Sequence, residues 1–393
     1  MERLGVYIQV PFCASKCSFC NFSSRVARED VYDGYCRALC REIGYLPELY
    51  KSAGIDLGLL TQAADTIYIG GGTPSLLGQG KLSTILEALR HRISFSSHLE
   101  FTLEVTPGSA GTEFLARARA LGVNRLSIGA QTFDDSELRA VGRLHSADDT
   151  RKLIRDARAL GYRNISLDLI AGLPHQTETS WQMTLRSALA LRPEHISLYL
   201  FEIDEKSRLG GEVLRHGTRY HAQFVPGEDF MAEAYESARE LLQQEGYRQY
   251  EISNFALPGS ESVHNLKYWQ LEPYIGLGAG AHSFDGQCRW ENESAADVYQ
   301  GKLARQESPI CAVRRLSISE QVEEFFFLGL RQRAGVQLAA ARKRWGGEAL
   351  GRWTETIAAL ERDGWLERVN GNVRLADHAL LVSNEIFQEF VAA

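Results

Sequence analysis

The chain has 393 residues, of which 44% are hydrophobic and 24% are charged, as in folded globular proteins. Its formal net charge is -7 and it has no block of Lys or Arg, which argues against nucleic acid as a partner. No stretch approaches the ~20 apolar residues that cross a membrane, and no signal-like segment opens the chain. The sequence therefore predicts a cytoplasmic protein, and its seven cysteines do not suggest a disulfide framework.

A buried strand is the first predicted element, over residues 4–10, and a cysteine-rich loop follows it directly. Cys13, Cys17 and Cys20 are so spaced that their thiolates can converge from one tight loop on one metal centre. A structural zinc site takes four ligands, and no fourth Cys or His follows at suitable spacing. Three thiolates instead favour a 4Fe-4S cluster with one iron open to another ligand. The alternatives at this point are a dithiol site and cysteines that are merely buried.

Five further apolar segments have the length and composition of buried strands, at 66–69, 98–105, 125–131, 164–170 and 195–201. Helical patterns lie between them, for example at 30–49 and 81–91. Strands that alternate with helices predict a parallel sheet with right-handed crossovers. We therefore expect an α/β protein with an open (β/α)6 barrel, a partial TIM-type barrel, over residues 1–203.

Polar residues of this barrel fall where its strands end, and in barrels of this type the chemistry gathers at the C-terminal ends of the strands. The run from Gly70 to Gly72 would let backbone groups approach a ligand, and Thr73 adds a hydroxyl. A tight turn before Pro74 is the structural alternative. Glu104 and Asp168 lie in otherwise apolar strands, where an unpaired carboxylate is costly, so each is satisfied either by a core partner or by a ligand.

Two further parts follow the barrel. Residues 204–310 are an extension of mixed elements, with a helix at 230–242, a strand at 247–255 and a small-residue segment at 274–282 suited to packing against the barrel. Residues 311–393 are helical and end in a hairpin pattern with an Asn-Gly turn. Helices followed by a hairpin resemble a winged-helix module. Its mixed surface charge favours packing or partner docking over DNA binding.

Together these motifs resemble the coproporphyrinogen-oxidase-like branch of the radical S-adenosylmethionine (SAM) proteins, and within it the HemW family of heme chaperones. The C-x3-C-x2-C motif, with the aromatic Phe19 before its last Cys, carries the resemblance, which spans nearly the whole chain. In that superfamily an open iron of the cluster chelates SAM, and an electron from the cluster cleaves SAM to a deoxyadenosyl radical. The resemblance implies that Cys13, Cys17 and Cys20 hold the 4Fe-4S cluster. It places the SAM contacts at Tyr7, Phe19, Gly71, Gly72, Thr73, Glu104, Gln131, Arg143 and Asp168.

The segment from His264 to Trp269 matches the H-N-x-x-Y-W motif of the heme chaperones. An imidazole can ligate heme iron, and Tyr268 and Trp269 offer flat apolar surface for a porphyrin, provided that both rings face the same side. As a bare pattern, a His beside aromatic residues suits a packed interface equally. With the radical SAM half beside it, the resemblance implies that His264 is the heme ligand, whereas His282 is interpreted as structural.

Two classes of function stay open. A heme carrier would bind heme and deliver it to acceptor hemoproteins, whereas a radical enzyme would act on a porphyrin, by decarboxylation or heme breakdown, or transfer a methyl group. The oxygen-independent coproporphyrinogen III oxidase has a further Cys where this chain has Phe22. The oxidase also has a long N-terminal extension before its cysteines, and the short segment before Cys13 leaves no space for one. We therefore expect a heme chaperone without that oxidase activity, and a homodimer is left open.

Overall fold

The computed structural model describes residues 4–55 and 58–391. In this part of the chain a twelve-stranded sheet has the order β14-β13-β12-β11-β1-β4-β5-β6-β7-β8-β10-β9. The predicted strands form its centre as β1 (Leu4–Val10), β4 (Ala64–Gly71), β5 (Phe95–Val105), β6 (Arg125–Gln131), β7 (Asn164–Ala171) and β8 (His195–Leu200). Neighbours among these strands are all parallel. The predicted α/β class with a parallel central sheet is confirmed.

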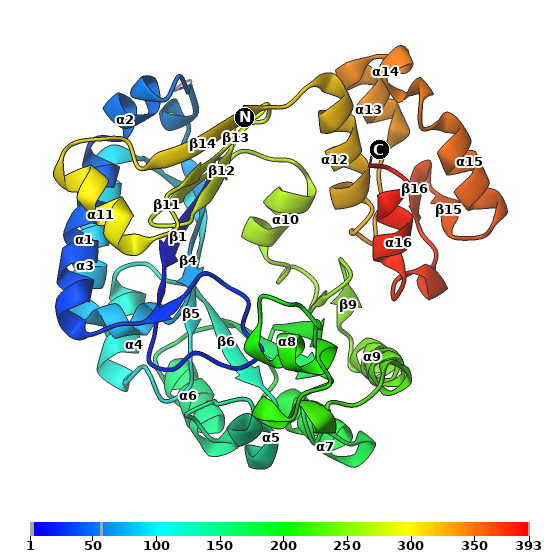
Figure 1. The fold of residues 1–393 in the computed structure, drawn as a ribbon, viewed down its shortest axis with the longest axis horizontal. Helices are drawn as coiled ribbons and strands as arrows, with labels where there is room; N and C mark the ends of the chain where they lie inside the picture. The colour runs from blue at the N-terminus through cyan, green and yellow to red at the C-terminus, as the bar shows by residue number, and fades with distance from the viewer. Residues whose placement is uncertain (1–3, 56–57, 392–393) are drawn as a thin grey trace.

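Helices connect the parallel strands and wrap around the outside of the sheet (Figure 1). They are α1 (Glu29–Gly44), α2 (Leu46–Ser52), α3 (Gly78–Arg92), α4 (Thr112–Ala120), α5 (Asp135–Ala140), α6 (Ala147–Ala159) and α7 (Glu178–Ala190). Two more helices, α8 (Arg208–Leu214) and α9 (Glu228–Gln244), follow β8. The pattern at 30–49 predicted one helix, but the structure has two, with a break at Tyr45. Pro47 lies in the first turn of α2 and has no backbone N–H with which to continue α1.

The two faces of the central sheet differ in polarity because side chains alternate along each strand. Apolar residues pack outward beneath the helices, among them Ile8, Ile67, Leu126 and Leu167, all at most 1% exposed. On the other face Tyr7, Tyr68, Thr102 and Arg125 follow one another in register across four strands. The interior is therefore lined with hydroxyl and charged groups, unlike the apolar interior of an ordinary TIM barrel.

The segment at 274–282, which we expected to pack against the barrel, does so as a further part of the sheet. β11 (Tyr274–Leu277) runs parallel to β1, and β12 (His282–Phe284), β13 (Cys288–Asn292) and β14 (Ile310–Arg315) follow antiparallel. The predicted strand at 247–255 is in fact a hairpin of β9 (Arg248–Gln249) and β10 (Asn254–Ala256). The turn forms because the Glu251 carboxylate accepts the N–H of Ser253 over 3.0 Å.

The C-terminal part is helical and lies to one side of the sheet, with α10 (Val263–Trp269) between them (Figure 1). Its elements, after α11 (Ala296–Ala304), are α12 (Ile318–Gly329), α13 (Leu338–Trp345), α14 (Gly347–Gly351), α15 (Thr354–Arg362), β15 (Leu366–Val369), β16 (Asn372–Leu375) and α16 (Ser383–Gln388). The predicted hairpin is present, and its turn residues Asn370 and Gly371 both have positive φ, at 51° and 84°. The winged-helix assignment and the boundaries at 203 and 310 stay predictions. No helix in the described residues is long and apolar enough for a membrane span.

Candidate functional site

The three motif cysteines lie on one short loop at the C-terminal end of β1. β2 (Phe12–Cys13) pairs with β3 (Arg25–Val26), and Cys17 and Cys20 lie between them. All three thiols are free and partly exposed. Burial raises the pKa of the Cys20 thiol, and the neighbouring Cys17 and Cys13 raise that pKa further because thiolates repel one another. A cationic iron-sulfur core would offset the repulsion between these thiolates.

Within the described residues, no three Cys, His, Asp or Glu side chains are grouped so as to hold a metal ion. A 4Fe-4S cluster makes a different demand, because its thiolates bind separate irons of a bulky core. The loop supplies three partly exposed thiols, which are the ligands that such a cluster requires.

The glycine run fastens the cysteine loop to β4. Gly72 donates its N–H to the carbonyl of Val10 over 2.8 Å, and Thr73 donates to the carbonyl of Phe12 over 2.7 Å. Gly71 has a φ of +104°, and a Cβ there would lie 2.4 Å from Oε1 of Gln9. The backbone conformation therefore requires glycine, and a Cβ would also displace the Gln9 side chain. The amides of Gly72 and Thr73 bind carbonyl groups of this chain, so contact of the glycine run with a ligand stays a prediction.

Glu104 and Asp168 share the polar interior of the sheet. Glu104 accepts the hydroxyl of Tyr68 over 2.8 Å, and burial raises its pKa to about 7, to which the negative charge of Asp168 adds. Burial also raises the pKa of Asp168, and the positive charge of Arg125 opposes this rise. The hydroxyl of Ser127 donates to Asp168 over 3.3 Å. The structure thus brings the two predicted carboxylates together, and their surroundings disfavour the ionised form of both.

Arg143 connects the cysteine loop to β6. Its guanidinium donates to the Cys17 sulfur over 3.5 Å and to the Gly129 carbonyl over 2.6 Å. Gly129 is the neighbour of Asp168 in register, and a bulge separates it from Gln131. Gln131 has a φ of 69°, a conformation that is uncommon for a residue other than glycine and that collects at functional sites.

Tyr7 and Phe19 complete the predicted SAM positions. The Tyr7 hydroxyl donates to Oε1 of Gln9 over 2.6 Å, and its ring stacks on Tyr68 with centroids 5.9 Å apart. Phe19 packs on a small apolar cluster that includes Leu209 and Met231. Tyr7 therefore faces the polar interior, and Phe19 anchors the cysteine loop to the elements that follow β8.

Tyr68, Arg125 and Ser127 are interior residues that the sequence analysis missed. Arg125 is 1% exposed, and its buried Nε has no hydrogen-bond partner among the described residues. It therefore supplies a buried positive charge that acts on Asp168. The signal was available: in the segment from Arg125 to Gln131, polar and small residues alternate with apolar ones, as on a strand with one polar face.

His264 lies at the N-terminal end of α10, where it is 1% exposed. Its Nδ1 is 2.8 Å from Oγ1 of Thr66, and its Nε2 is 2.8 Å from the Tyr268 hydroxyl. Burial lowers its pKa to about 3, so the imidazole is neutral near pH 7. Both ring nitrogens are occupied, and iron ligation would require one of these hydrogen bonds to break. The assignment of His264 as heme ligand stays a prediction.

The two aromatic residues of the same motif face different neighbours. The ring of Tyr268 meets Tyr274 edge-on, with centroids 4.7 Å apart. In contrast, the guanidinium of Arg331 lies over Trp269, 4.5 Å from the centroid of the Trp269 ring. Successive helical residues point about 100° apart, so α10 cannot present both rings to one porphyrin face. In this structure the motif closes the polar interior on one side and contacts the C-terminal part on the other.

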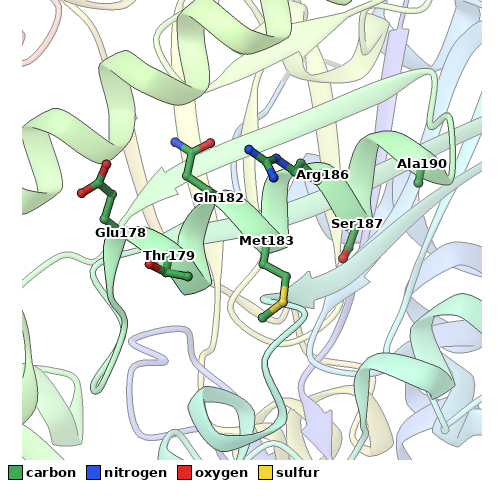
Figure 2. Close-up of a pocket in the computed structure, with 7 residues that line it drawn as sticks. All are labelled: Glu178, Thr179, Gln182, Met183, Arg186, Ser187 and Ala190. Atoms are coloured by element: carbon green, nitrogen blue, oxygen red, sulfur yellow. The ribbon is translucent and has the colours of Figure 1, made fainter.

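A surface depression lies away from all of these residues, on α7. Figure 2 shows its side chains projecting from that helix: Glu178, Thr179, Gln182, Met183, Arg186, Ser187 and Ala190. None of the predicted site residues lines it. The depression offers neither a thiol nor an imidazole, and we assign it no ligand.

Comparison with known proteins places the chain among radical SAM proteins. The model of the Radical SAM superfamily matches residues 7–188, and that of the HemN C-terminal domain matches residues 316–382. The heme chaperone HemW of Bacillus subtilis is 35% identical over 388 residues, which are 98% of this chain and 99% of the relative. HemW of Escherichia coli is 35% identical over 283 residues, covering 72% of this chain and 70% of the relative.

Among solved structures, the coproporphyrinogen III oxidase HemN of Escherichia coli superimposes with a TM-score of 0.85 and 23% identity, covering 99% of this chain and 90% of the oxidase. At that identity the likeness establishes the fold alone. Radical SAM domains use a 4Fe-4S cluster and SAM, and the match over residues 7–188 implies both for this chain.

Proposed function

Because the chain belongs to the HemW family of radical SAM proteins, we propose that it is a heme chaperone, which binds a 4Fe-4S cluster, SAM and heme and delivers heme to hemoproteins. Relatives that bear the name heme chaperone support this, one of them along nearly its whole length. The cluster would be held by Cys13, Cys17 and Cys20. Acceptor hemoproteins are the partners that this function requires.

The observation that carries the proposal is the bridge formed by Arg143. This one side chain contacts Cys17 at 3.5 Å and the carbonyl of Gly129, next to Asp168, at 2.6 Å. It joins the loop that would hold the cluster to the strands that would hold SAM. Loss of either partner would release a guanidinium that is half-buried between them.

The residues of the chain define how SAM would be held. Glu104 is fixed by Tyr68 and by the amide of Gly71, so an ionised carboxylate there can accept hydrogen bonds from ligand hydroxyls. Asp168 and Arg143 supply charges of opposite sign nearby for an amino acid moiety. When bound, a cluster with an open iron and SAM supply one-electron chemistry; the chain itself positions the two and covers the interior with α10.

Anaerobic reconstitution followed by heme titration tests this function. We expect wild-type protein to take up one 4Fe-4S cluster and then heme, and we expect SAM to perturb the spectrum of the reduced cluster. Protein that holds its cluster yet binds no heme would contradict the chaperone function and would favour an enzyme that acts on another substrate.

A further inference from the structure

Two exposed histidines meet beside the cysteine loop. His175 follows the C-terminal end of β7, and His221 lies in the 3-10 segment Arg219–Phe224. Nε2 of His175 is 2.9 Å from Nδ1 of His221, and both residues are exposed. The outer ring nitrogens of the pair, Nδ1 of His175 and Nε2 of His221, have no hydrogen-bond partner among the described residues. In contrast to His264, this pair offers an imidazole lone pair to solvent.

The pair lies at the same edge of the sheet as the cysteine loop, because the C-terminal ends of parallel strands meet there. The amide of Leu209, in α8, donates to the carbonyl of Ser18 in the cysteine loop over 2.8 Å. The apolar cluster beneath α8 includes both Leu209 and Ala222, which directly follows His221. Cysteine loop, α8 and the histidine segment are therefore packed as one unit.

The histidine pair is held by its surroundings. The amide of His175 donates to the carbonyl of Phe224 over 2.9 Å, and the two rings stack with centroids 4.3 Å apart. His175, Tyr220 and His221 have φ values of 69°, 56° and 64°, in the sparsely populated left-handed region. Such conformations persist where neighbouring contacts enforce them, and they collect at ligand sites.

A neutral pair must place one proton between the two facing nitrogens. With that proton on Nδ1 of His221, the imidazole donates to His175 and leaves its Nε2 lone pair pointing outward. This is the arrangement of metal-bound histidines, whose second ring nitrogen donates to a fixed acceptor. Nδ1 of His175 is less accessible because it lies next to its own backbone and its ring is stacked on Phe224. Nε2 of His221 is therefore the candidate metal ligand.

The surface around the pair suits a porphyrin. Tyr220 and Phe224 are 37% and 49% exposed, and each belongs to the same short segment as His221. The guanidinium of Arg208 lies 5.1 Å from the ring centroid of Tyr220 and donates one N–H to the carbonyl of Lys16, which leaves its other N–H groups to pair with a carboxylate. Exposed aromatic rings beside an imidazole and a guanidinium match the flat macrocycle, the iron and the propionates of heme.

We propose that His221 ligates the iron of bound heme through Nε2, and that His175 is the positioning residue that fixes its tautomer and orientation. The inference rests on the proposed function, because it assumes that the protein carries heme. It assigns the heme to the edge of the sheet beside the cysteine loop, whereas His264 contacts Thr66 near the N-terminal end of β4.

Titration of cluster-loaded, full-length protein with ferric heme, followed by the Soret band, tests the assignment. His221→Asn removes the imidazole and tolerates the left-handed backbone. We expect it to weaken heme binding by at least about tenfold and to shift the Soret maximum, as for loss of an axial ligand. His175→Ala should weaken binding about tenfold, and His175→Gln should restore most of the affinity, since its amide oxygen can accept the proton of His221. A retained cluster spectrum shows that each variant is folded.

His216→Asn is the matched control, because His216 is also exposed and has a φ of 53° on the neighbouring turn. It should bind heme as wild type does. Metal-free protoporphyrin IX separates iron ligation from surface contacts, and His221→Asn should leave its affinity unchanged. Wild-type heme affinity and Soret spectrum in His221→Asn would overturn the inference; if His264→Ala then loses heme, the heme chaperone function still stands. Absence of heme binding by wild-type protein would overturn both.

Discussion

The carboxylate of Glu104 accepts the amide of Gly71 over 2.9 Å, which joins β5 to the glycine run that fastens the cysteine loop. One acidic side chain thus connects the strand ends that would hold SAM with the support of the cluster loop. Its protonation state therefore bears directly on ligand binding.

We predict that SAM affinity rises as pH increases through about 7, the value to which burial raises the pKa of Glu104. Above that pH the carboxylate is ionised and accepts ligand hydroxyls with both oxygens. Glu104→Gln should bind SAM more weakly, by about 1–3 kcal/mol, with little dependence on pH. Asp168→Asn should weaken binding too, but should move the midpoint of the pH dependence downward, because the charge of Asp168 raises the pKa of Glu104. Calorimetric titration with SAM across the pH range measures both; an unchanged pH profile in Glu104→Gln would refute this role.

The cysteine assignment predicts a selective loss of iron. Replacing Cys13, Cys17 and Cys20 by Ala should abolish the visible absorption and the bound iron and sulfide after anaerobic reconstitution. Replacing Cys36 and Cys40 is the matched control, because both lie in α1, away from the loop. Equal iron content in the two variants would remove the basis of the cluster site.

A buried carboxylate outside the site governs stability. Glu42, 1% exposed, accepts hydrogen bonds from the amide of Gly278, the Asn292 side chain and the Tyr299 hydroxyl, at 2.8, 2.6 and 2.5 Å. Above about pH 7, where Glu42 is ionised, Glu42→Gln places an amide NH2 among these donors, so it should lower the free energy of unfolding by about 1–3 kcal/mol. Glu48→Gln, on the exposed face of α2, should change it little.

The pH dependence of stability has a definite sign here. Burial raises the pKa of Glu42 to about 7 from 4.5, so the folded state binds more protons than the unfolded state between these values. The stabilisation from this group is therefore complete below pH 4.5 and is lost as pH rises to about 7. Glu104 contributes in the same direction. Denaturant unfolding should show that the free energy of unfolding falls less steeply with rising pH in Glu42→Gln than in wild type. An identical fall in the two proteins would mean that Glu42 is ionised throughout.

We also predict that the protein does not convert coproporphyrinogen III to protoporphyrinogen IX. The sequence resemblance implies a further Cys in the oxidase at the position of Phe22, which here is 67% exposed beside the cysteine loop. Chromatography of anaerobic reactions with SAM and reductant should show substrate only. Formation of protoporphyrinogen at a rate that depends on SAM would establish the rival enzyme function.

The sequence predicted the central strands because their β-branched and apolar residues form buried runs bounded by glycine and polar ends. It could not show the hairpin at 247–255, since the turn depends on a hydrogen bond made by the side chain of Glu251. β11 was missed because it is short and its glycine carries little strand signal, although Gly276 pairs in register with Tyr7.

The same limits apply to the candidate site. Motif spacing singled out the cysteines, and a charged residue in an apolar strand singled out each carboxylate. The structure brings these carboxylates into one interior. The pairing of His175 with His221 was not visible, because left-handed backbone at a histidine has no sequence signal and the two residues are 46 positions apart. The divergence of Tyr268 and Trp269 follows from the helical conformation of α10, which the motif alone did not reveal.

The most direct test of the central claim is heme transfer from the loaded full-length protein to an apo-hemoprotein, followed by the Soret bands of donor and acceptor. The proposed function predicts that the acceptor gains intact heme as the donor loses it, with no porphyrin product formed. Heme that is never released to the acceptor, or that is consumed in the presence of SAM and reductant, would contradict it.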